Sequence, residues 1–125
     1  MEFYKCSICG KIVAIVKDGF GDTECCGEPM AKLVPNTSDG AGEKHVPAAK
    51  VEGNTLSVQV GTVEHPMTSE HHIEWIALET SLGNQRKMLN PLKKPEAKFA
   101  LMAGEKVKAV YEYCNLHGLW KAAMD

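Results

Sequence analysis

The side chains best suited to chemistry in this sequence are its five cysteines and five histidines. Cys114 stands alone near the C-terminal end, three residues before His117. The other four cysteines lie in the first 26 residues, at Cys6, Cys9, Cys25 and Cys26. Four thiolates can close the coordination sphere of one soft metal ion. A lone cysteine beside a histidine indicates a second metal site, rich in nitrogen and with one sulfur.

The four N-terminal cysteines form a C-x2-C pair and, after fifteen intervening residues, an adjacent pair. In a C-x2-C pair a tight turn directs both sulfurs toward one ion, and Gly10 follows where the chain leaves that turn. Adjacent side chains of an extended chain point in opposite directions, so Cys25 and Cys26 can share an ion only where the backbone bends. Gly27 and Pro29 stand nearby to allow the bend. The pattern predicts a distorted tetrahedral four-thiolate site, for which zinc and iron are both suitable.

The histidines fall at the ends of predicted strands, at His45, His65, His71, His72 and His117. Because the loops at one end of a β-sandwich converge, that end could gather several of them around one ion. His71 and His72 would point to opposite faces of a strand, and His71 shares its parity with the more apolar face. His71 is therefore favoured over His72 as the inward residue. For any single histidine, a surface or hydrogen-bonded role remains the alternative.

A shared site of four imidazoles and one thiolate would have unusual chemistry. Its five protein donors would exceed the four of a structural zinc site and leave one octahedral position open to a small molecule. Neutral imidazole suits ferrous iron, and a thiolate opposite the open position would donate electron density toward it. The donors of this predicted site are His45, His65, His71, His117 and Cys114.

Two charged residues stand immediately before one of these histidines. Glu43 and Lys44 precede His45, so the backbone ties a carboxylate and a cation to a predicted ligand. Beside an open position, Lys44 would attract an anion and supply hydrogen bonds. Glu43 could occupy the position after a substrate leaves. The alternative is a solvated charge pair at the end of a linker.

The elements that must position these side chains are short strands. Apolar residues alternate or cluster over residues 56–60, 73–77, 99–102 and 107–113, with turn signals at residues 53–54, 83–84 and 103–104. The segment PNTSDGAG, residues 35–42, has the composition of a linker. We therefore predict a small metal-binding domain over residues 1–36 and an immunoglobulin-like antiparallel β-sandwich over residues 37–125.

Composition restricts the partners. The net charge of −2 over 125 residues provides no basic surface for a nucleic acid. No apolar run is long enough to span a bilayer, which predicts a cytoplasmic protein without a membrane partner. An odd number of cysteines, two of them adjacent, favours thiolates held by metal over disulfides. The N-terminal domain is too short to bury a core and needs a metal ion or a partner to stabilise it.

Four segments together resemble one known family. Its motifs are matched, in the right order and over nearly the whole chain, by CSICG through ECCGEPM, by GEKHVP, by EHPMTSEHHIEW and by EYCNLHGLW. The sequence is similar to desulfoferrodoxin, the two-iron form of superoxide reductase. This resemblance implies a desulforedoxin-like domain followed by an immunoglobulin-like sandwich, in a homodimer. One departure is Leu119, where some members carry a histidine that is not a ligand, so only a local effect is expected.

The resemblance also implies the cofactors and the activity. It implies two mononuclear iron ions per chain and neither haem nor nucleotide. The implied activity is one-electron reduction of superoxide to hydrogen peroxide, with electrons from a donor such as rubredoxin. In the family, the residue matching Glu43 binds the oxidised iron and the residue matching Lys44 assists at its open face. The implied ligands are Cys6, Cys9, Cys25 and Cys26 for a rubredoxin-like centre, and His45, His65, His71 and His117 in a plane with Cys114 axial for the second.

Two other functions remain compatible with the residues. The protein could be an electron carrier that uses the N-terminal iron alone, or a binding module stabilised by zinc. Metal content and the visible spectrum would discriminate among the three, because zinc is colourless and two different ferric thiolate centres give two sets of bands.

Overall fold

The computed structural model describes residues 1–40 and 44–124, and the chain forms two compact units, Met1–Val34 and Pro35–Asp125. This division lies close to the predicted boundary between residues 36 and 37. Asn36 belongs with the second unit because its backbone pairs with strand β12 (Gly118–Ala123). The described residues contain strands and no helix, which confirms the predicted mainly β class. Accordingly, none of them forms a helix with the length and apolarity needed to cross a membrane.

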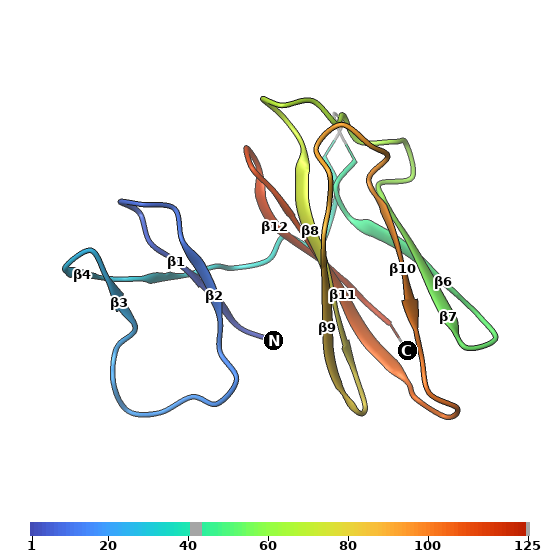
Figure 1. Cartoon of the computed structure of the whole chain (residues 1–125), viewed down its shortest axis with the longest axis horizontal. Helices are drawn as coiled ribbons and strands as arrows, with labels where there is room; N and C mark the ends of the chain where they lie inside the picture. Colours follow the sequence, from blue (N-terminus) through green and yellow to red (C-terminus); the bar gives the residue numbers. More distant parts are fainter. Residues whose placement is uncertain (41–43, 125) are drawn as a thin grey trace. The chain divides into compact units, whose positions relative to one another are not determined.

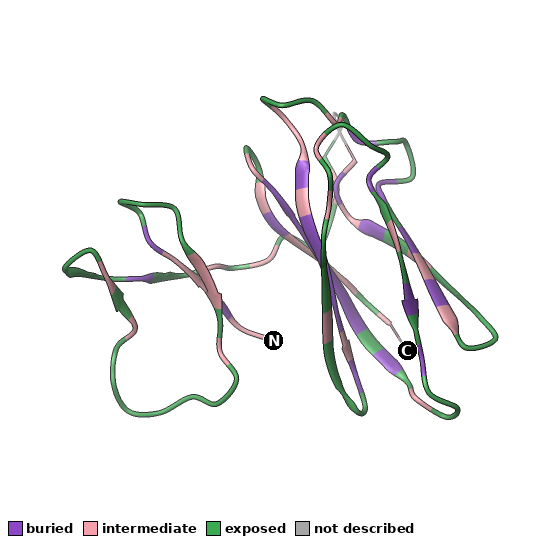
Figure 2. Cartoon of the chain, in the orientation of Figure 1, coloured by how far each residue is buried: buried purple, intermediate pink, exposed green. Residues whose placement is uncertain are grey.

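The first unit has little core. Its buried side chains are those of Phe3, Cys6 and Met30, and Figure 2 shows most of its residues as exposed. A unit of this size with three buried side chains needs a staple such as a metal ion. One sheet has the order β2-β1-β5 and the other is the hairpin β3-β4. The strands of this unit are β1 (Phe3–Lys5), β2 (Ile12–Ala14), β3 (Glu24–Cys25), β4 (Glu28–Pro29) and β5 (Ala31–Lys32).

The second unit is a sandwich of two antiparallel sheets (Figure 1), as the immunoglobulin-like prediction required. One sheet has the strand order β10-β7-β6 and the other has the order β12-β11-β8-β9. Strands β8 and β11 lie in the middle of the larger sheet and are buried along most of their length. Besides β12, the strands are β6 (Pro47–Glu52), β7 (Thr55–Val60), β8 (Ile73–Thr80), β9 (Gly83–Met88), β10 (Glu96–Ala100) and β11 (Val107–Cys114).

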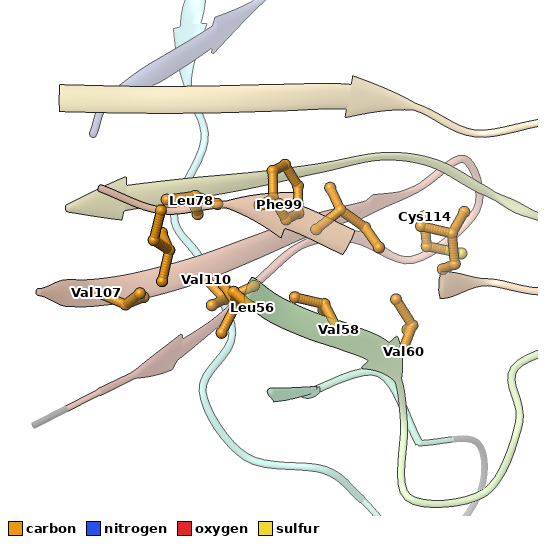
Figure 3. Packing of buried hydrophobic residues seen from close by; sticks show 11 residues of the cluster. Leu56, Val58, Val60, Leu78, Phe99, Val107, Val110 and Cys114 are labelled. Carbon is orange, nitrogen blue, oxygen red and sulfur yellow. The ribbon is translucent and has the colours of Figure 1, made fainter. Parts of the chain in front are cut away.

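The core lies between these two sheets. Alternate residues of β7, Leu56, Val58 and Val60, are almost fully buried and pack with residues of β8, β10 and β11. Fully burying one such side chain stabilises the fold by about 1.5–3 kcal/mol. Figure 3 shows Val107 at one end of this cluster, with Val60 and Cys114 at the other. The lone cysteine therefore closes one end of the core.

Some local predictions were wrong. The predicted turn at residues 83–84 is the start of β9, and the turn lies at Ser81 and Leu82 instead. The strand predicted over residues 99–102 begins earlier and ends at Ala100. Strands β6 and β9 were not predicted because most of their residues are exposed, so their side chains show no apolar alternation.

Candidate metal centres

The four N-terminal cysteines lie together in the first unit. Cys6 and Cys9 stand in the turn after β1, whereas Cys25 and Cys26 come from the β3–β4 hairpin. Their four sulfurs lie within 4.8 Å of one another, with Cys9 Sγ 3.6 Å from Cys25 Sγ. Cys26 has a φ of 54°, the left-handed conformation that bends the backbone and brings adjacent side chains to one point. The bend that adjacent cysteines require is therefore present, followed by Gly27 with a φ of 78°.

Backbone amides favour negative charge on this cluster. The N–H of Cys9, 3.5 Å from Cys6 Sγ, and the N–H of Ile8 lower the pKa of the Cys6 thiol to about 6. Hydrogen bonding to the sulfurs of Cys9 and Cys6 raises the pKa of the Cys25 thiol, which keeps its proton beside an existing thiolate. An incoming ion must displace such protons, so its affinity increases with pH.

The second group comprises the remaining cysteine and four of the five histidines. One ligand atom from each member lies within 4.8 Å of the others. Every member stands at a strand end at the same end of the sandwich, because β6 and β8 start where β7 and β11 finish. The group consists of His45 before β6, His65 after β7, His71 before β8, Cys114 at the end of β11 and His117 in the following turn.

The four imidazoles form a ring of neighbours. The ring centroids lie 4.6 Å apart for His45 and His65, and 4.7 Å apart for His65 and His71. The circle is completed by separations of 5.1 Å between His71 and His117 and 4.9 Å between His117 and His45. Interplanar angles of 63–84° make each ring nearly perpendicular to its neighbours. Four imidazoles thus surround one point.

The cysteine sulfur lies close to two opposite corners of this square. Cys114 Sγ is 3.7 Å from His65 Nε2 and 3.8 Å from His117 Nδ1, which are donors at opposite corners. The sulfur is therefore shared between two opposite imidazoles and does not belong to one of them. These distances are compatible with a thiolate outside the plane of four imidazole nitrogens.

The pairing of β8 with β11 brings His71 to Cys114. Cys114 faces Ile73 across a register irregularity that begins after the Tyr113–Trp75 pair. Beyond the strands, the Asn115 N–H donates to the His72 carbonyl, and the His72 N–H donates to the Asn115 side-chain oxygen, 2.9 Å away. These two bonds extend the ladder and fix the segment that carries His71 against the turn that carries His117.

Hydrogen bonds set the orientation of two histidine rings. His65 Nδ1 lies 2.7 Å from the Pro66 carbonyl, which can only accept, so Nδ1 carries the proton and the lone pair is on Nε2. His72 Nδ1 lies 2.9 Å from the backbone carbonyl of Thr68, so the His72 ring is held in the loop before β8. His65 is therefore prepared to bind an ion through Nε2, and His72 stands outside the five-residue group.

The segment that carries His45 is held by a carboxylate and a glycine. Asp39 Oδ1 accepts hydrogen bonds from the backbone N–H groups of His45 and Val46. Gly61, with a φ of +81°, packs so closely that an added Cβ would lie 2.5 Å from the Lys44 carbonyl oxygen. The half-buried Lys44 donates from Nζ to the Gly40 carbonyl at 2.9 Å. The other predicted loop residue, Glu43, lies outside the described residues.

A buried carboxyl group lies next to the thiolate position on the same strand. Glu112 is fully buried, and its two oxygens have no hydrogen-bond partner among the described residues. Burial, with a smaller effect from the charge of Asp39, raises the pKa of Glu112 to about 9. The group is therefore neutral at pH 7, and it adds no second negative charge to the face of β11 that carries Cys114.

Family models match both units. A model described as desulfoferrodoxin matches residues 37–123, and one described as the desulfoferrodoxin N-terminal domain matches residues 1–33. The chain belongs to the desulfoferrodoxin family. The desulfoferrodoxin of Nitratidesulfovibrio vulgaris is 50% identical over 121 residues, which cover 97% of this chain and 94% of that protein.

Solved structures that resemble this chain include proteins described as superoxide reductases. The superoxide reductase from Treponema pallidum is 35% identical, with a TM-score of 0.85, over 97% of this chain and 96% of that one. The superoxide reductase (1Fe-SOR) from Giardia intestinalis is 39% identical, with a TM-score of 0.54, over 67% of this chain and 99% of that one. The family is thus one of oxidoreductases.

The donor sets fit the two iron centres of a desulfoferrodoxin. Four thiol sulfurs from two turns suit a tetrahedral ion, and four imidazoles with one thiol suit an iron with an open position. Leu119, the departure noted in the sequence, is buried opposite Tyr113 and does not belong to either donor group.

Sequence reasoning missed two residues that hold or adjoin the second group. Asp39 was treated as part of a linker, although an aspartate before a glycine is a common turn residue that can accept backbone N–H bonds. Glu112 was included in a strand, although its parity with Cys114 pointed to the interior. Alternation was the available signal for Glu112, whereas nothing in the sequence identified the amides that bind Asp39.

We predict that Gly61→Ala weakens both the fold and the second metal group. Any L-residue at this positive φ costs about 1–2 kcal/mol, and the new Cβ would also press on the carbonyl oxygens of Lys44 and Val63. The unfolding free energy, from urea denaturation, should fall by more than the strain alone, and the second group should bind Co²⁺ more weakly.

The matched control is Gly104→Ala. Gly104 has the same φ of +81°, but an added Cβ there would meet nothing within 4 Å. Gly104→Ala should lower the unfolding free energy only by the cost of the backbone strain, and its second group should bind Co²⁺ normally. Equal effects of the two substitutions would show that the contact with Lys44 has no consequence.

We predict that Glu112→Gln becomes increasingly stabilising as the pH rises from 4.5 to about 9. Below the ordinary pKa of 4.5 the carboxyl is protonated in both the folded and unfolded states. Above it the unfolded chain ionises while the folded chain does not, so the wild type loses stability until the pH reaches about 9. Urea denaturation of the zinc-loaded proteins should give a difference on the order of 1–3 kcal/mol at pH 7.

The exposed Glu96→Gln on β10 controls for the loss of one carboxyl group. A difference between Glu112→Gln and the wild type that stays constant over this pH range would contradict a neutral buried carboxyl.

Proposed function

We propose that the chain is a superoxide reductase that combines superoxide, one electron and two protons to form hydrogen peroxide. The observation that carries the proposal is the group of four imidazoles arranged around one point, with a single cysteine sulfur close to two opposite members. Ferrous iron held there would supply the electron. Similarity to proteins named superoxide reductase supports the same activity.

The protein's own residues prepare this chemistry. Burial of His45, His65 and Cys114 keeps bulk water from most of the donor atoms. The bond from His65 Nδ1 to the Pro66 carbonyl fixes the tautomer that binds metal through Nε2. The neutral Glu112 avoids charge repulsion with a Cys114 thiolate. Five donors are one fewer than an octahedral ion takes, which leaves access for a small anion.

Lys44 is proposed to attract the substrate. Its side chain is half-buried beside His45, and its ammonium is held by the Gly40 carbonyl. A net charge of −2 repels an anionic substrate overall, so a cation one residue before a predicted ligand has a large relative effect. For Glu43 we propose, from the family resemblance, binding to the oxidised iron.

The remaining assignments are proposals from the family resemblance. They are an Fe(Cys)4 centre at the four N-terminal cysteines, a rubredoxin-like electron donor and a homodimer. A reducing compartment keeps the thiols available as ligands, and we propose the cytoplasm.

The reaction stoichiometry tests the proposal. We predict that the reduced, iron-loaded protein yields one hydrogen peroxide per superoxide and releases no dioxygen. Cys114→Ser should lose both this activity and the thiolate-to-iron absorption of the oxidised second centre. The spectrum of the Fe(Cys)4 centre should stay intact in the variant and serve as the internal control.

Each rival function has its own outcome in this experiment. Release of dioxygen would indicate dismutation instead of reduction. A second centre that superoxide does not oxidise would indicate an electron carrier, and a colourless zinc protein would indicate a binding module. Survival of the second thiolate band in Cys114→Ser would exclude Cys114 as a ligand.

We predict that Lys44→Ala slows the reaction with superoxide by about 10-fold and weakens its dependence on ionic strength. Pulse radiolysis at several salt concentrations measures both effects. Lys50→Ala makes the same change of net charge on β6 and removes only an exposed ion pair with Glu52, so it should react like the wild type. If Lys44→Ala and the wild type have equal rates at every salt concentration, the steering role is wrong.

A further inference from the structure

Trp120 contacts two members of the second group, although it offers no ligand atom. Its indole ring stacks on the imidazole of His45, with ring centroids 4.6 Å apart and an interplanar angle of 12°. Its Nε1–H donates to the backbone carbonyl of His117 at 3.2 Å. One side chain therefore joins two predicted ligands that are 72 positions apart in the sequence.

Neither of these histidines is supported by a strand of its own. His45 precedes β6 and is held through its backbone N–H by Asp39, which leaves the direction of its ring to other contacts. His117 lies in the turn between β11 and β12. A face-to-face stack defines the plane of the His45 ring, and the indole hydrogen bond fixes the turn of His117.

Trp120 is itself firmly anchored. The backbone of Asn36 lies alongside β12, where its N–H donates to the Leu119 carbonyl and its carbonyl accepts from the Lys121 N–H, both at 2.9 Å. These bonds are on either side of Trp120 and form a short parallel bridge with it. On its other side, β12 pairs with β11, where Trp120 faces Glu112. The indole is therefore a rigid support for the two histidines.

The contact also favours the metal-bound state over the metal-free state. An imidazole that binds a cation becomes more electron-poor, and an electron-poor ring is attracted more strongly to the face of an indole. A groove of about 550 Å³ runs past these residues and is lined by Asn36, His45, His117 and Trp120. Without the indole, more of the His45 ring would be open to this groove.

We propose that Trp120 is a positioning residue of the second metal centre, orienting the His45 ring by stacking and fixing the His117 turn through its indole N–H. This inference rests on the ligand set of the proposed function. Residues that orient metal ligands typically change metal affinity by about 10–100-fold when they are replaced.

Metal affinity tests the role independently of superoxide chemistry. The full chain, with zinc in the four-cysteine group, is titrated with Co²⁺ against a chelator. Trp120→Leu, which removes the stack and the N–H, should weaken Co²⁺ binding at the second group by at least about 10-fold and alter its absorption bands. Trp120→Phe keeps an aromatic face and should recover most of the affinity.

Trp75→Phe is the matched control. Trp75 stacks on Tyr113 and is the only other tryptophan in the sequence. The control should bind Co²⁺ normally, and its remaining tryptophan fluorescence, from Trp120, should be quenched when Co²⁺ binds beside it. Wild-type affinity and bands in Trp120→Leu, or an equal loss in Trp75→Phe, would overturn the inference. A protein that binds Co²⁺ as expected but does not reduce superoxide would contradict only the proposed function.

Discussion

The antiparallel pairing of β8 with β11 is the constraint on which the second centre depends. A slip of one residue between these strands would turn every side chain to the opposite face and move Cys114 out of the core. The two faces of these buried strands carry side chains of different size, since Ile76 and Leu78 enter the core whereas Trp75 stacks on Tyr113. A slip would place side chains of the wrong shape in the core, which opposes it. The irregularity beside Cys114 then shifts the start of β8 by one residue relative to β11. The two hydrogen bonds between Asn115 and His72 hold this shifted pairing.

Much of this arrangement could be predicted from the sequence. Alternating apolar residues identified β7, because burial on one face produces a period of two. The mostly apolar segment of β8 identified a strand that is buried on both faces. Family motifs then supplied the expected ligands, which the fold gathers at one end of the sandwich. Exposed strands such as β9 carry no comparable pattern, since their side chains mostly face solvent.

Two contacts that support the second group could not be predicted, because they form only in the folded chain. Asp39 acquires its role only when the amides of His45 and Val46 turn toward it. The stack of Trp120 on His45 requires the whole second unit to fold, because the two residues lie near opposite ends of the unit's sequence. Sequence spacing describes what neighbours along a chain can do, and the contact of Trp120 with His45 joins parts of the chain that spacing does not relate.

The two groups of donors therefore assemble in different ways. The four-cysteine group uses only the turn after β1 and one short hairpin, in a unit with almost no core of its own. Its ion must contribute directly to folding. Donors of the second group are brought together by the sandwich core before any ion is required. The exposed thiols belong to the first group, which contains Cys9 and Cys26 beside the buried Cys6, whereas Cys114 of the second group is buried. During synthesis, an oxidant would reach the N-terminal thiols first, and early metal loading protects them from sulfenic acid and disulfide formation as well as completing their fold.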